Sequence, residues 1–146
     1  MKFFGILACV LAVSAALYFG WLARFVATGL NNIQHDSIVQ AYEAAKAQGE
    51  LVGLPVRNTE GTSNSLWGDY KEGFYLLDAS FPYEDIKPRM FAIYKAPDGP
   101  TINHSARVKQ GDDWIMEGDG NRGSDPILMT AKNYIGVVHE NTVWRY

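Results

Sequence analysis

Residues 90 to 116 read MFAIYKAPDGPTINHSARVKQGDDWIM, and the way apolar runs alternate with turn signals in this stretch decides the class of fold. Short strand-like segments at Met90–Tyr94, Ala106–Lys109 and Trp114–Met116 are separated by Pro97-Asp98-Gly99-Pro100 and by Gly111-Asp112. Clusters of Pro, Gly and Asp are typical of tight turns between strands. We therefore expect consecutive strands joined by turns, at the centre of a mainly β domain.

The same pattern continues on both sides of this stretch. Phe74–Leu77 precedes it, and Tyr134–His139 and Thr142–Trp144 follow it, each as a further predicted strand. We expect residues 61–146 to form one small β domain. Hydrophobic residues make up 47% of the chain and charged residues 20%, so a packed core is expected.

Charge and cysteine content exclude several classes of function. The net charge of −3 argues against an electrostatic grip on nucleic acid, so no nucleic-acid partner is expected. The one cysteine, Cys9, excludes an internal disulfide and a zinc site built from several cysteines.

The N-terminal segment predicts a membrane anchor. From Phe3 to Ala23 the chain has no charged residue, which is long enough for a helix to span a bilayer. Val13-Ser14-Ala15 offers the alternative of a cleaved signal peptide, but the apolar run continues past that site. We expect residues 1–30 to be an uncleaved single-pass anchor, with the lipid bilayer as a partner and the domain on the extracytoplasmic side.

Residues 31–60 are expected to form a short juxtamembrane helix and a linker. Asp36 is a candidate cap for a helix whose apolar positions run from Ile38 to Gly49. The stretch from Asn58 to Asn64 is rich in Gly, Ser and Thr, which indicates a loop.

The candidate functional residues lie on either side of the predicted strands. The stretch from Glu117 to Pro126 reads EGDGNRGSDP and places Asp119 and Asp125 six residues apart in a Gly-rich turn, after His104 and Ser65. A hydroxyl, an imidazole and a carboxylate are the components of an activated serine nucleophile. The two aspartates do not have the ligand spacing of a calcium-binding EF-hand loop.

Six short segments occur in the order found in one family of proteases. They are Ser65-Leu66-Trp67-Gly68 with Gly73 eight residues after Ser65, Ile86-Lys87-Pro88 before the strand to Tyr94, Ile102–Val108, Trp114–Asn121, Asp125-Pro126 and Ile135-Gly136-Val137-Val138. In this order the chain resembles the type I signal peptidase-like serine proteases, whose clan also contains the self-cleaving repressor domains. The histidine in Ile102–Val108 is typical of the archaeal and endoplasmic-reticulum branch.

This resemblance implies a role for each matched residue. Ser65 would be the nucleophile and His104 its general base, with Asp119 or Asp125 orienting the imidazole. The backbone N–H of Ser65 and the Ser63 hydroxyl would bind the oxyanion, and Leu66 would line the substrate cleft. The substrate would be an extended segment of a preprotein, with small residues at the first and third positions before the cut. Neither a metal nor an organic cofactor is implied.

The nucleophile segment departs from the family's motif, and a second residue could serve as the base. Ser63, Leu66 and Gly68 stand where the family has Gly, Met and Pro, so a catalytically silent binding or assembly module on the same scaffold is the alternative. Lys109, the nearest lysine, is an alternative base, but its offset of five residues from His104 predicts that it lies on the opposite face of a regular strand.

Overall fold

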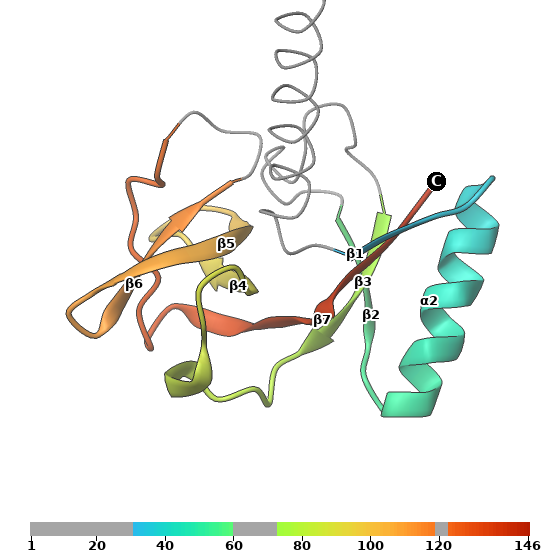
Figure 1. Ribbon diagram of the computed structural model, residues 1–146, viewed down its shortest axis with the longest axis horizontal. Helices are drawn as coiled ribbons and strands as arrows, with labels where there is room; N and C mark the ends of the chain where they lie inside the picture. Colours follow the sequence, from blue (N-terminus) through green and yellow to red (C-terminus); the bar gives the residue numbers. More distant parts are fainter. Residues whose placement is uncertain (1–30, 60–72, 119–122) are drawn as a thin grey trace, which may run out of the picture.

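The protein is described by a computed structural model for residues 31–59, 73–118 and 123–146. A single sheet dominates these residues, which confirms the expected mainly β fold (Figure 1). Its strand order is β2-β3-β7-β4-β5-β6, antiparallel throughout, and β1 adds a parallel pairing to β7. The elements are β1 (Asn31–Gln34), α2 (Ile38–Val52), β2 (Val56–Asn58), β3 (Gly73–Asp78), the 3₁₀ turn η1 (Tyr83–Asp85), β4 (Phe91–Lys95), β5 (Thr101–Gln110), β6 (Asp113–Glu117) and β7 (Tyr134–Arg145).

The range 31–60 contributes more than a helix. It contains the expected helix, α2, and two strands that were not predicted, β1 and β2, which pair with β7 and β3 of the same sheet. Ser37 caps the helix by accepting a hydrogen bond from Gln40 N–H at 3.3 Å, so the cap is not Asp36. Gly53, with φ of 71°, ends the helix in the left-handed conformation that glycine adopts without strain.

The β4–β5 hairpin forms around the predicted Pro-Asp-Gly-Pro turn. Ala92 lies opposite His104 and Lys95 opposite Thr101, so β5 begins five residues earlier than the predicted Ala106. Its polar residues Asn103, His104 and Ser105 obscured the strand in the sequence, yet all three are buried. Side-chain polarity therefore predicted this strand poorly, because both of its faces are covered.

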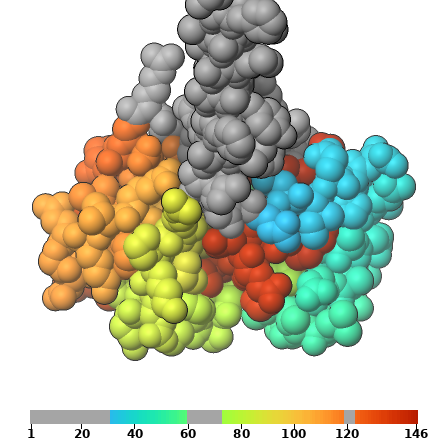
Figure 2. Space-filling model, viewed as in Figure 1, coloured from blue at the N-terminus to red at the C-terminus, as the bar shows by residue number. Residues whose placement is uncertain are grey.

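Strand β7 is one bent strand where two were predicted. Glu140 and Asn141 both have positive φ, and between Val138 and Val143 the strand carries extra residues that its partner β3 lacks. The Asn141 side chain fixes this bend by accepting the Phe91 N–H at 3.0 Å and donating to the Arg89 carbonyl at 3.1 Å. In the space-filling view, the red β7 segment lies between the yellow-green chain on one side and β1 and α2 on the other (Figure 2).

Hydrophobic residues pack in three clusters. One lies within the β4–β5–β6 end and includes Tyr94, Ala106, Trp114, Met116 and Met129. A second joins β3, β4 and β7, and a third packs α2 against Phe74, Leu76 and Trp144. Within the described ranges no helix is both long and apolar enough to cross a bilayer, and the expected anchor at residues 1–30 lies outside those ranges.

Candidate active site

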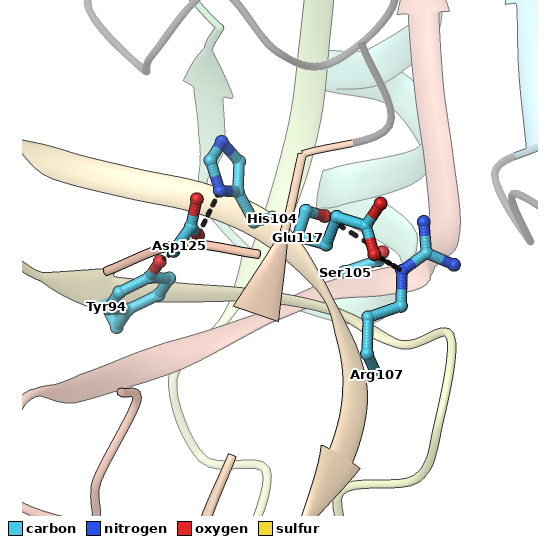
Figure 3. Close-up of polar contacts among 6 residues, drawn as sticks. All are labelled: Tyr94, His104, Ser105, Arg107, Glu117 and Asp125. Carbon is cyan, nitrogen blue, oxygen red and sulfur yellow. Dashed lines mark hydrogen bonds and ion pairs between the residues drawn. The ribbon is translucent and has the colours of Figure 1, made fainter. Parts of the chain in front are cut away.

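His104 lies in the middle of β5, with only 2% of its surface exposed. The β4–β5 register puts it directly opposite Ala92, on the face where Tyr94 and Ile102 also lie. Figure 3 shows its Nδ1 atom facing Asp125, with the other ring nitrogen pointing away from this carboxylate. Nδ1 of His104 contacts Oδ2 of Asp125.

Asp125 comes from the segment that follows β6 and is held there by its backbone. Its N–H donates to the Met116 carbonyl at 2.8 Å, and Trp114 and Met129 exchange two further backbone hydrogen bonds. The 125–129 segment thus runs along the outer edge of β6, and the Asp125 side chain is 9% exposed. A carboxylate hydrogen-bonded to Nδ1 of an imidazole stabilises the imidazolium and selects the tautomer with the proton on Nδ1.

Tyr94 is the third member of this cluster and was not among the predicted site residues. Its hydroxyl donates to Oδ2 of Asp125 at 2.5 Å, and its side chain is fully buried. Burial raises the pKa of the Tyr94 phenol well above its usual value, and its hydrogen bond to Asp125 and the carboxylate's charge act in the same direction. The phenol therefore remains a hydrogen-bond donor.

The position of the hairpin turn in the sequence could have indicated that Tyr94 lies near His104. A turn centred on Asp98 pairs Tyr94 with Ile102 and Ala92 with His104, as observed. Tyr94 and His104 are then diagonal neighbours on one face of the hairpin, within reach of long side chains.

The polar side chains that follow His104 in β5, those of Ser105 and Arg107, contact Glu117. Ser105 donates from its hydroxyl to the Glu117 carbonyl at 3.1 Å, and Arg107 Nε lies 3.2 Å from Glu117 Oε2 (Figure 3). About a third of each of the Arg107 and Glu117 side chains is exposed, so this ion pair contributes at most about 1 kcal/mol. Ser105 lies on the opposite face of β5 from His104, which makes it a poor nucleophile for this imidazole.

The prediction that Lys109 lies on the face of the strand opposite to His104 was wrong. A bulge between Ala106 and Val108 inserts one residue into β5, so the alternation of faces reverses and Lys109 lies opposite Trp114. Lys109 is nevertheless exposed at the far end of the strand, with its ammonium 5.5 Å from the centre of the Trp114 ring. Its position on the strand does not bring it to the His104–Asp125 pair.

The remaining predicted site residues lie outside the described ranges. These are Ser63, Ser65, Leu66 and Asp119. Of the predicted site, the structure therefore brings together His104 and Asp125. In the described ranges, His, Cys, Asp and Glu side chains do not form a group of three or more that could ligate a metal ion.

A separate pocket of about 430 Å³ lies beside the β7 bend and has a mainly apolar lining that includes Phe81, Met90 and Val138. Neither His104 nor Asp125 lines it. No family model matches the chain, and no curated protein or solved structure is detectably similar to it.

Proposed function

We propose that this chain is a membrane-anchored serine endopeptidase of the signal-peptidase type, with Ser65 as nucleophile, His104 as base and Asp125 as the residue that orients the base. The part-buried contact between His104 Nδ1 and Asp125 Oδ2 carries this proposal. Of the two aspartates that the sequence left open, Asp125 is the one with a described contact to the imidazole.

The chemistry follows from the orientation of the imidazole. With its proton on Nδ1 directed at Asp125, His104 presents the lone pair of Nε2 on the side away from the carboxylate (Figure 3). Ser65 Oγ attacks the peptide carbonyl carbon while its proton passes to Nε2. The imidazolium then donates that proton to the leaving amine, and water hydrolyses the acyl-enzyme by the same route in reverse. Asp125 stabilises the imidazolium in both steps.

The substrate and location follow from the resemblance. We propose an extended preprotein segment with small residues at the first and third positions before the cut, bound near the membrane surface on the extracytoplasmic side. Extended peptides bind to such domains through main-chain hydrogen bonds to strand edges. The Ser65 N–H and Ser63 would hold the oxyanion, with Leu66 against the substrate.

The second candidate is a silent binding or assembly module on the same scaffold. Ser63, Leu66 and Gly68 favour it, because each departs from the family's nucleophile motif. A shift of ~1 Å in the nucleophile costs on the order of a hundredfold in rate.

The deciding experiment uses the full-length chain in membranes together with a reporter that carries a signal peptide. We expect cleavage by the wild type and none by Ser65→Ala or His104→Ala. Ser80→Ala is the matched control, because the Ser80 hydroxyl bonds to Asp78 in an exposed turn; it should cleave as the wild type does. Absence of cleavage by a folded, inserted wild type would favour the silent module, and cleavage by Ser65→Ala would exclude Ser65 as nucleophile.

A further inference from the structure

We infer that Tyr94 is a positioning residue for the proposed protease: its hydroxyl holds the Asp125 carboxylate against the imidazole of His104. The catalytic meaning of this inference rests on the proposed function. Its physical content rests on the contacts of Tyr94, Asp125 and His104 (Figure 3).

Asp125 needs such support because of where it stands in the fold. It lies outside the named strands, and the N–H bond to the Met116 carbonyl fixes its backbone but not its side-chain rotamer. Tyr94 belongs to β4, a strand with β5 and β7 on either side, and its ring is fully buried. A hydroxyl carried by such a rigid element can hold a carboxylate in one orientation.

Both donors converge on the same carboxylate oxygen. Tyr94 Oη donates to Oδ2 at 2.5 Å, and His104 Nδ1 contacts the same Oδ2 atom. The Tyr94 hydrogen bond holds the carboxylate where it meets Nδ1, and an acceptor at Nδ1 keeps the proton on that ring nitrogen. Because the phenol pKa is raised, Tyr94 keeps its proton over the working range of a protease and remains a donor.

Arg107 and Glu117, the charged residues nearest to His104 along β5 and β6, form an ion pair with each other. Ala92 faces His104 from β4, and the Arg107–Glu117 pair belongs to a separate contact set, with Glu117 lying across from Ser105 on the opposite face. The contact between Tyr94 and Asp125 is therefore the described interaction best placed to act on the tautomer of His104.

The test measures the tautomer of His104 directly. The full-length chain is labelled with ¹⁵N-histidine, and its three histidines are assigned with His35→Gln and His139→Gln variants. In the neutral state we expect wild-type His104 to carry its proton on Nδ1. In Tyr94→Phe we expect the ratio of the Nδ1–H tautomer to the Nε2–H tautomer to fall on the order of tenfold, the equivalent of one hydrogen bond.

Tyr134→Phe is the matched control. The Tyr134 hydroxyl donates to the Phe81 carbonyl at 2.9 Å and its ring packs against the same hydrophobic cluster, but its hydrogen bond does not involve Asp125. This variant should keep the wild-type tautomer. An unchanged tautomer in folded Tyr94→Phe would overturn the inference and reduce Tyr94 to a core residue.

A second measurement covers the case in which Tyr94→Phe does not fold. In the wild type, the Tyr94 hydroxyl proton should exchange slowly with water and show a nuclear Overhauser effect to the His104 ring. Absence of this protected proton overturns the inference without any variant.

Reporter cleavage separates this inference from the proposed function. A tautomer change in Tyr94→Phe, with no cleavage by the wild type, supports the positioning contact and refutes the protease. Cleavage by the wild type and by Tyr94→Phe with the same kcat and the same pH profile keeps the protease and overturns the role of Tyr94.

Discussion

The two ends of the sheet are built differently (Figure 1). At one end Tyr94 from β4 and His104 from β5 form a largely buried polar cluster with Asp125, which follows β6 in the chain. At the other end α2 packs small residues on β3 and β7, in a cluster formed by Ala41, Ala45, Phe74, Leu76 and Trp144. The first end combines these hydrogen bonds with a hydrophobic cluster around Trp114 and Met116, whereas the second depends on apolar burial. The comparison teaches that the residues of the proposed chemistry differ from those that pack α2 on the sheet.

Asp125→Asn gives the largest expected effect at the polar end. We expect the cleavage rate to fall up to about 10⁴-fold, because an amide no longer stabilises the imidazolium or selects the tautomer. The free energy of unfolding should change by only about 1–3 kcal/mol. Reporter cleavage measures the rate, and urea unfolding measures the free energy of unfolding. Asp98→Asn, in the exposed hairpin turn, should alter neither; a similar loss of cleavage in both variants would contradict the assignment.

Leu76→Ala tests the apolar end. Leu76 is fully buried beneath α2, so its truncation should lower the free energy of unfolding by about 2–5 kcal/mol. Cleavage per folded molecule should stay within about twofold of wild type, since the His104–Asp125 pair lies at the other end. Leu51→Ala, at a position 81% exposed, should cost less than about 0.5 kcal/mol. A large loss of specific activity in Leu76→Ala would show that the two ends are coupled.

Ser37→Ala gives a smaller effect, at the start of α2. Loss of the capping hydroxyl should lower the free energy of unfolding by about 1 kcal/mol. Asp36→Ala is the control, because the sequence indicated Asp36 as a candidate cap. If thermal unfolding shows the greater loss in Asp36→Ala, the observed cap geometry is wrong.

The last effect appears only at alkaline pH, at the edge of the polar end. Burial, together with the charge of Asp78, raises the pKa of Tyr134 from 10.0 to about 12. The neutral phenol is thus favoured by folding, so its contribution is full below about pH 10 and is lost as the pH rises towards about 12. Urea unfolding across this range should show a shallower decline for Tyr134→Phe than for wild type. Equal slopes would mean that Tyr134 ionises alike in the folded and unfolded chains.

Much of the sheet could be predicted from local pattern. Turn residues and apolar runs indicated β3, β4, β6 and both halves of β7, because strand propensity and turn chemistry act over a few residues. The prediction failed for the first half of β5, where polar residues occupy a strand that is covered on both faces. It also missed β1 and β2, which are short and owe their pairing to distant partners.

The candidate site could be predicted only in part. His104 and Asp125 were chosen from the sequence, but nothing local distinguished Asp125 from Asp119. The bulge after Ala106 reversed the predicted face of Lys109, because one inserted residue shifts every side chain beyond it.

The sequence by itself determined the class of fold, the position of the hairpin turn and the residue types available for chemistry. These features depend on neighbours along the chain. Only the tertiary structure decided that Asp125 meets His104, that Tyr94 joins them and that β7 bends as one strand at Glu140 and Asn141. Those contacts join residues far apart in sequence, and their geometry depends on strand register and on how the 125–129 segment runs along β6.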